Sequence, residues 1–173
     1  ARLYHYYPSK EAILVDSLER YTGRLLAIAE DVRARGLAPH EALRALVREF
    51  LAEYRHSREY HVSLLNDVKF LDEAPRARIR ARERAIVEEF AATLERAYPH
   101  RIQPGTRKPL TMALLGMINF TFAWLRPEGP MSYEQYADLV IGLWERGLDD
   151  GPPFLREALA VLECSPARLE HAS

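Results

Sequence analysis

The chain has 173 residues and a formal net charge of −1; 48% of its residues are hydrophobic and 28% are charged. This length and composition can bury a core, which argues against a disordered chain, and the balanced charge means that nucleic acid could be bound only through a local patch. The single cysteine, Cys164, excludes an internal disulfide and a metal site built from several thiolates of one chain, as is typical of a reducing cytoplasm.

No segment resembles a signal peptide or a membrane span. The longest strongly apolar stretch covers residues 110–125 and contains Asn119. It falls short of the roughly 20 residues that a bilayer span needs. We therefore expect a cytoplasmic protein without a membrane partner.

Apolar residues recur with helical spacing along nearly the whole chain, and no run shows the period-two alternation of a strand, so the sequence predicts an all-α fold. Ser9 has the side chain of an N-cap, Gly36 suits a helix end, and Ser132 with Gln135 makes a capping box. The predicted helices span residues 9–36, 39–56, 60–71, 75–98, 109–125, 132–148 and 153–162.

The stretch LYHYYPSKEAIL, residues 3–14, combines tyrosines, a histidine and a lysine with the start of a helix. Each of these side chains can donate to a phosphate, and the open amide groups of a helix N-terminus add partial positive charge at the same place. This arrangement suits a nucleic-acid backbone. The alternative is that Tyr6 and Tyr7 pack on Ile13 and Leu14 as a hydrophobic staple.

LYHYYPSKEAIL resembles the end of the recognition helix and the start of the next helix in the TetR family of one-component transcriptional regulators. The resemblance implies that Tyr4, Tyr6 and Lys10 contact DNA phosphates and that Tyr7 is buried. His5 and Tyr6 stand in the reverse of the commoner order, so either of them could face the phosphate. The first two helices of the helix-turn-helix domain, which would carry the base-reading side chains with most of the recognition helix, are expected to precede this sequence.

On this resemblance, residues 1–35 form the end of the helix-turn-helix domain and its connecting helix. Residues 36–165 form a TetR-like ligand-binding and dimerisation domain, and residues 166–173 form a polar tail. A homodimer would place its recognition helices in successive major grooves of a palindromic operator. A small effector would release it by favouring a conformation whose half-site spacing no longer matches.

The stretch MALLGMINFTFAWLRPEGPMS, residues 112–132, places small and aromatic residues on one helical face, where another helix can approach closely. With the apolar side of the next helix, it predicts a helix pair that meets its two-fold mate as a four-helix bundle. The alternative is that these residues all belong to the core of one chain. The predicted interface residues are Gly116, Ala123, Tyr136, Val140, Leu143 and Trp144.

Asn119 is polar within an apolar run, and a buried amide requires partners on a ligand or on a facing helix. NFTFAWLRPEGPMS also resembles a pattern in TetR-type regulators of fatty-acid, phenylacetate and steroid catabolism, which implies an acyl-CoA thioester as the effector. The predicted ligand-binding residues are Phe70, Met117, Asn119, Phe120, Trp124 and Arg126.

RARIRARER places Arg76, Arg80 and Arg84 on one stripe at the start of a helix, where cations oppose the helix dipole. Arginines at this unfavourable position indicate a polyanion nearby. With the basic loop over residues 99–108, the stripe could grip the phosphates of coenzyme A. The alternative is a solvated basic surface that neighbouring glutamates partly offset.

The sequence contains no glycine-rich phosphate loop, no nucleophile elbow and no HExxH, so we predict neither an enzyme nor a catalytic residue. His56 and His61 lie off a shared helical face, and the other histidines show no ligand spacing, so we predict no metal site and no cofactor. Two alternative functions remain open. One is an efflux-type repressor that binds aromatic or cationic compounds, and the other is a helical lipid carrier that does not bind DNA.

Overall fold

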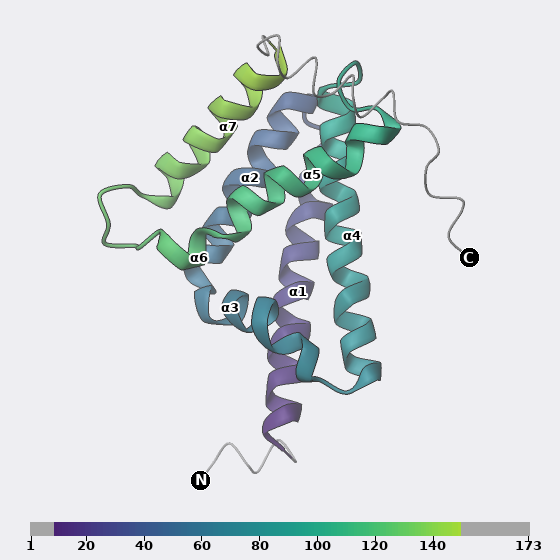
Figure 1. Cartoon of the computed structure of the whole chain (residues 1–173), viewed down its shortest axis with the longest axis vertical. Helices are drawn as coiled ribbons and strands as arrows, with labels where there is room; N and C mark the ends of the chain where they lie inside the picture. Colours follow the sequence, from purple (N-terminus) through teal and green to yellow (C-terminus); the bar gives the residue numbers. More distant parts are fainter. Residues whose placement is uncertain (1–8, 150–173) are drawn as a thin grey trace, which may run out of the picture.

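The computed structural model describes residues 9–149, and within that range it consists of helices and turns without a strand, which confirms the all-α prediction. None of the helices described there combines the length and the apolarity that a membrane crossing needs. The helix predicted over 153–162 and the polar tail lie outside the described residues. In chain order the elements are α1 (Lys10–Ala34), α2 (Pro39–His56), α3 (Arg58–Asp67), the 3-10 turn η2 (Val68–Phe70), α4 (Glu73–Ala97), α5 (Pro104–Asn119), α6 (Thr121–Trp124) and α7 (Tyr133–Asp149) (Figure 1).

The first two helices begin and end where their local signals predict. The Ser9 side chain accepts a hydrogen bond from the backbone N–H of Ala12 at 3.0 Å, which confirms Ser9 as the cap of α1. Just past α1, Gly36 has a φ of +60°, a left-handed conformation that glycine adopts without a side-chain clash. α2 begins at Pro39 and ends at His56, as predicted.

The predicted start of α5 is wrong, because the helix begins at Pro104 rather than at Pro109. The reason is a cap that the spacing of apolar residues does not indicate: the backbone N–H of Gln103 donates to Oγ1 of Thr106 at 2.9 Å. Pro109 therefore lies inside the helix, where it cannot donate to the carbonyl of Gly105. Both Pro109 and Gly105 are exposed, so that carbonyl stays accessible to solvent.

The single helix predicted over 109–125 is also wrong at its other end, because it breaks at Phe120 into α5 and α6. The carbonyl of Asn119 accepts a hydrogen bond from Nε2 of His61 at 2.9 Å. The backbone N–H of Ala123 donates to the carbonyl of Phe120 instead, at 3.1 Å. A side chain from α3 thus takes the place of one bond of the helical ladder.

The helices α1, α2 and α4 form the central layer; α5 crosses it, and α7 lies along α2 (Figure 1). Phe50 of α2 and Phe90 of α4 are fully buried and meet edge to face, with ring centroids 4.8 Å apart. The predicted capping box of α7 is confirmed, because Ser132 and Gln135 exchange hydrogen bonds at 2.8 and 3.1 Å. Ion pairs hold α7 on α2: Arg44 with Glu145, Arg48 with Asp138, and Arg55 with Glu134.

The first turns of α1 project past α3 and α4 at one end of the molecule (Figure 1). Near that end, Glu11 accepts a hydrogen bond from the backbone N–H of Asp72 at 3.1 Å. Further along α1, the Glu19 carboxylate accepts a hydrogen bond from Nε of Arg78, on α4, at 2.8 Å. These contacts join the first half of α1 to the start of α4.

Candidate ligand-binding site

A cavity of about 70 Å³ lies between the central layer and α5. Every helix from α1 to α5 contributes to its wall, so residues far apart in the sequence meet there. The wall is mainly apolar with a few polar groups, as is common in sites for small organic molecules. The lining residues are Leu25, Tyr54, His61, Leu64, Leu65, Glu83, Ile86, Val87, Leu115 and Asn119.

His61 joins α1, α3 and α5 through hydrogen bonds. Its Nε2 lies 2.9 Å from the carbonyl oxygen of Asn119, and its Nδ1 lies 3.0 Å from the hydroxyl of Tyr21. Because a carbonyl can only accept, Nε2 carries the proton and Nδ1 accepts from Tyr21. Burial lowers the pKa of His61, so the folded protein holds this ring neutral at pH 7.

Asn119 is the second polar centre of the cavity. The hydroxyl of Tyr54, on α2, donates to its Oδ1 at 2.7 Å, so the expectation of a partner on a facing helix is confirmed. The Tyr54 ring also stacks on His61, with centroids 4.0 Å apart, and burial raises the pKa of Tyr54, which keeps the donating proton in place. The amide nitrogen of Asn119 has no hydrogen-bond partner among residues 9–149, which leaves it available to a ligand.

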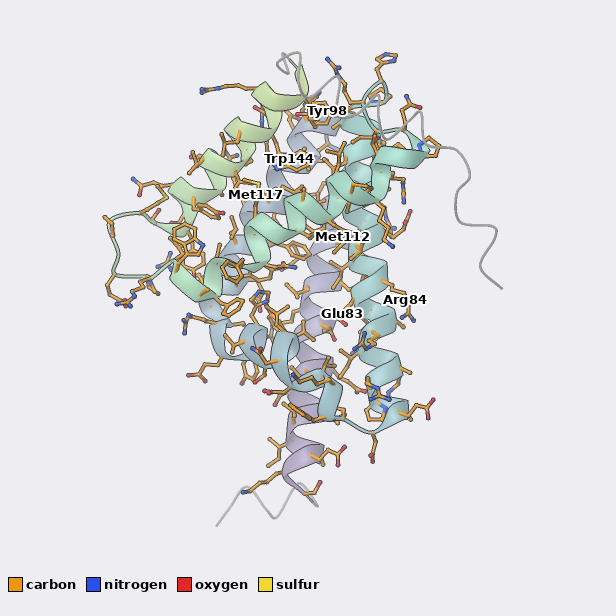
Figure 2. The ribbon with its side chains drawn as sticks, in the orientation of Figure 1. Glu83, Arg84, Tyr98, Met112, Met117 and Trp144 are labelled. Carbon is orange, nitrogen blue, oxygen red and sulfur yellow. The ribbon has the colours of Figure 1, made fainter. Side chains whose placement is uncertain are left out.

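A surface groove of about 460 Å³ runs along α4 outside the cavity, lined by Arg80, Glu83, Arg84, Val87 and Glu88. Glu83 and Val87 lie one helical turn apart and line both the groove and the cavity. Burial raises the pKa of Glu83, and the charges of Arg80 and Arg84 oppose that shift. Figure 2 shows Glu83 on the inner side of α4 and Arg84 on its outer side.

The arginines of residues 76–84 divide into two groups. Three of them donate to neighbouring residues: Arg76 to the carbonyl of Lys69, Arg78 to the Glu19 carboxylate and Arg82 to the Glu19 carbonyl. Arg80 and Arg84 form no hydrogen bond or ion pair within the described part of the chain, and both face the groove. They are the two cations of this stretch that are free to meet an anionic ligand.

Arg107, in the predicted basic loop, lies in the first turns of α5 and is already paired. Its Nη1 donates to Glu88 at 2.9 Å and its Nε to Glu95 at 3.2 Å. The hydrogen bond with Glu88 raises the pKa of Arg107 and lowers that of Glu88. A phosphate would have to compete with these carboxylates for Arg107.

The structure brings one of the predicted ligand-binding residues, Asn119, to the cavity. Phe70 is 74% exposed at the end of η2, with the Lys69 ammonium 5.0 Å from its ring centroid. Arg126 is exposed in the turn between α6 and α7. Met117 is half-buried between α5 and α7, where its sulfur accepts a hydrogen bond from Nε1 of Trp144 at 3.3 Å (Figure 2).

The remaining two predicted ligand residues, Phe120 and Trp124, are exposed. We use the name α5–α7 face for the exposed apolar residues of α5, α6 and α7 together with Phe120. Gly116 and Ala123, predicted for the dimer interface, are exposed on it as well. Five of the eight large hydrophobic side chains exposed within residues 9–149 belong to this face, which sets it apart from the rest of that surface. They are Met112, Phe120, Trp124, Leu139 and Leu143.

Tyr136, Val140 and Trp144 are predicted for the same interface, and their interface role stays a prediction, but the structure places them inside the protomer. All three are buried within the protomer, with exposed fractions of 8%, 0% and 9%. The hydroxyl of Tyr136 donates to the carbonyl of Met117 at 2.9 Å. α7 turns this side toward the protomer's own helices, so the burial needs no second chain.

Lys10, the predicted phosphate contact, is the first residue of α1, and its side chain is exposed. Tyr4, His5 and Tyr6 lie outside the described residues. The DNA-binding role of all four stays a prediction.

The sequence pattern indicates no metal site at His61 and does not reveal the part of His61 in the cavity wall. A signal was present, since His61 shares helical spacing with Leu64 and Val68, two apolar residues that are also buried. Residues 9–149 hold no group of three or more His, Cys, Asp or Glu side chains placed to bind a metal ion.

Comparison with known proteins assigns the fold. The sequence model of a family described as "Tetracyclin repressor-like, C-terminal domain" matches residues 36–148, a range that includes every cavity-lining residue except Leu25. No curated protein sequence matches the chain. The structures described next share its fold over most of its length.

A TetR-family transcriptional regulator from Bordetella parapertussis 12822 is 30% identical, with a TM-score of 0.78 over 83% of this chain and 75% of that chain. PfmR from Thermus thermophilus, a TetR-family transcriptional regulator, is 29% identical, with a TM-score of 0.75 over 85% of this chain and 81% of that chain. AibR, solved in complex with isovaleryl coenzyme A and operator DNA, is 24% identical, with a TM-score of 0.70 over 82% of this chain and 77% of that chain. Sequence and fold agree that this chain belongs to the TetR family of transcriptional regulators, which are not enzymes.

Proposed function

We propose that the protein is a homodimeric repressor that binds a palindromic operator and is released from it by a small acyl-CoA thioester. The observation that carries the proposal is that one helix, α1, lines the cavity with Leu25 and begins at Lys10, the predicted DNA contact. At about 1.5 Å per residue, these two positions lie roughly 22 Å apart on a single rod. A change at the cavity can therefore reach the DNA end without an intervening hinge.

The hydrogen bonds of the cavity wall support this coupling. Tyr21 lies one turn before Leu25 on α1 and donates to His61, so a ligand that shifts His61 acts on α1 directly. The effector shifts the population toward a conformation in which the two α1 helices of a dimer no longer match the half-site spacing. To empty the operator, it must bind this released conformation better by several kcal/mol.

The chemistry of the site supports an effector with one apolar and one anionic end. The inner cavity has room for a short hydrocarbon group and offers the Asn119 amide as a donor to a thioester carbonyl. The groove outside offers Arg80 and Arg84 to phosphates, which guanidinium groups bind with paired hydrogen bonds. AibR binds isovaleryl coenzyme A, but at 24% identity it shares only the fold, so the proposal rests on this chain's own side chains.

The α5–α7 face supports the homodimer. Phe120 and Leu143 are 60% and 56% exposed there. Exposure of large apolar side chains to water is unfavourable in free energy, so burial in a dimer would stabilise this face. Gly116 and Ala123 leave room for a second helix to approach closely. A two-fold axis through this face would join two helices from each protomer into a four-helix bundle.

The proposal is tested with the full-length protein and a labelled duplex that carries the DNA beside its own gene. Fluorescence anisotropy is measured with butyryl-CoA and, as the control, with coenzyme A alone. We expect butyryl-CoA to weaken DNA binding by about tenfold or more, equivalent to a coupling free energy of about 1.4 kcal/mol, and coenzyme A alone to have little effect. Release by cationic dyes alone would favour the efflux-type repressor, and absence of salt-sensitive duplex binding would favour the lipid carrier.

A further inference from the structure

Glu83 stands where the cavity meets the groove. Together with Val87 it lines both spaces, whereas Arg80 and Arg84 line the groove and not the cavity. A ligand with one end in each space has to pass the side chains of Glu83 and Val87. Glu83 is therefore placed to select what enters.

The hydrogen-bond inventory of the cavity separates Glu83 from the other polar residues. Tyr54 donates to Asn119, and both ring nitrogens of His61 are engaged. Glu83 is half-buried and forms no hydrogen bond or ion pair with any residue between 9 and 149. The mouth of the cavity thus presents a carboxylate that no hydrogen bond or ion pair within residues 9–149 engages, with Arg80 and Arg84 on its groove side. The space behind it presents one donor, the amide of Asn119.

Charge decides which ligand end passes this mouth. A ligand carboxylate brought within about 4–6 Å of Glu83 would put two like charges side by side in partly desolvated surroundings, which is unfavourable. Arg80 and Arg84 act on Glu83 from the groove side, and neither lines the cavity, so a carboxylate inside the cavity meets Glu83 first. A thioester carbonyl carries no charge and can accept from Asn119, while the phosphates of the same molecule stay outside.

We infer that Glu83 is a specificity-determining residue: it excludes free short-chain carboxylates from the cavity and admits the neutral acyl end of a thioester whose phosphates remain at Arg80 and Arg84. This inference rests on the proposed function, since it concerns the same effector site. It adds that the protein distinguishes an activated acyl group from the corresponding free acid through one side chain.

The test compares full-length wild-type protein with Glu83→Gln and Glu88→Gln. The first variant removes the charge at nearly constant shape. The second is the matched control, because Glu88 lines the groove only and pairs with Arg107. Affinity for butyryl-CoA is measured by isothermal titration calorimetry, and affinity for butyrate by competition against butyryl-CoA.

We expect wild-type protein to bind butyryl-CoA and to prefer it strongly over butyrate. Glu83→Gln should gain about tenfold or more in butyrate affinity, equivalent to about 1.4 kcal/mol, and keep its affinity for butyryl-CoA. Glu88→Gln should show no gain for butyrate. Glu83→Ala is the second neutral variant if Glu83→Gln does not fold.

Unchanged discrimination in the Glu83 variants, with butyryl-CoA still bound, overturns the role of Glu83 and leaves the proposed effector standing. Wild-type protein that binds no butyryl-CoA overturns both. Binding of butylamine by wild-type protein that Glu83→Gln abolishes also overturns both, because it assigns the site to cations.

Discussion

A single hydroxyl at Tyr54 satisfies the side-chain acceptor of Asn119 in the cavity wall. It donates to Oδ1 of Asn119 at 2.7 Å while its ring stacks on His61. Tyr54→Phe keeps the ring and leaves that oxygen without a donor. We expect the free energy of unfolding to fall by about 1–2 kcal/mol, because an unpaired, partly buried acceptor loses its solvation without compensation.

Urea unfolding followed by circular dichroism measures this loss. Tyr60→Phe is the matched control, since Tyr60 is 45% exposed, and we expect its free energy of unfolding to stay within about 0.5 kcal/mol of wild type. Equal effects of the two substitutions would contradict the role given to the Tyr54 hydroxyl.

His61 makes the free energy of unfolding fall as the pH drops below about 6.5. Its pKa is lowered in the folded protein, chiefly by burial, from an ordinary value of 6.5. Below pH 6.5 the unfolded chain takes up a proton that the folded chain does not, so the free energy of unfolding falls as the pH drops toward the folded pKa. The loss amounts to about 1.4 kcal/mol for each unit by which the pKa is lowered.

The measurement is the slope of unfolding free energy against pH between about 7 and 5 for wild type, His61→Gln and His100→Gln. His61→Gln should show a shallower slope than wild type, and His100→Gln, a histidine substitution outside the cavity, is the control. The variants have to be compared because Glu83 also contributes to the pH dependence. Its pKa is raised in the folded protein, so just above its ordinary value of 4.5 its contribution to the free energy of unfolding increases as the pH drops. A wild-type slope that survives in His61→Gln would refute the assignment.

At the scale of the element, helix ends were predictable wherever the signal is local. Ser9, Gly36 and Pro39 act within one turn of themselves, and the structure has them where their chemistry predicts. The start of α5 was also local, but its cap uses Gln103 and Thr106, a less familiar pair than serine with glutamate.

The break after Asn119 could not have been read from the sequence in the same way. It depends on a hydrogen bond between Asn119 and His61, 58 residues apart along the chain, and on Tyr54 from a third helix. No local spacing encodes such a contact. For the same reason the sequence predicts the cavity wall only in part. Polarity within an apolar run distinguishes Asn119, whereas nothing local distinguishes Glu83 from the other glutamates beside the arginines.

Two glycines of the α1 region should respond to alanine with opposite signs. Gly36 has a φ of +60°, so alanine there is strained, and we expect a loss of about 1 kcal/mol. Gly23 lies inside α1, and nothing stands within 4 Å of an added Cβ, so Gly23→Ala should stabilise by about 0.5–1 kcal/mol. The thermal unfolding midpoint should fall for Gly36→Ala and rise for Gly23→Ala. A shift in the same direction for both variants would contradict the argument from backbone conformation.

At the scale of the whole molecule, the sequence indicated the α5–α7 face but not which side of α7 belongs to it. Val140 and Leu143 are three residues apart, yet Val140 is fully buried and Leu143 is 56% exposed. The choice depends on how α7 is rotated against α2, where Ala137 and Val140 are buried and the pair of Arg44 with Glu145 lies beside them. Helical periodicity defines the faces of a helix, whereas its partner decides which face is covered.

Leu143→Glu should therefore weaken the proposed dimer, because it would bury a charge at a helix contact. Phe70→Glu is the matched control, since Phe70 is equally apolar and 74% exposed but lies at η2, away from α5 and α7. Sedimentation equilibrium should show a dimer dissociation constant raised by about tenfold or more for Leu143→Glu and unchanged for Phe70→Glu. Equal dissociation constants for the two variants would place the interface elsewhere.

The DNA-binding end of the molecule can be tested through its charge. Lys10 is exposed at the start of α1, where a phosphate contact would also benefit from the helix N-terminus. Because such a contact carries no base information, Lys10→Ala should weaken binding to operator and to random duplex alike. It should also make the plot of log affinity against log salt concentration shallower by about 0.9 for each protomer.

Lys108→Ala makes the same change in net charge at the opposite end of the molecule, in the first turns of α5 (Figure 1). Fluorescence anisotropy at several salt concentrations should give it the wild-type slope, because beyond a Debye length of about 8–10 Å a lysine contributes little to phosphate binding. Should both variants lower the slope equally, net charge and not a contact at Lys10 would explain the effect. A slope lowered by Lys10→Ala alone would locate the DNA at the end of α1, on the same helix that lines the cavity.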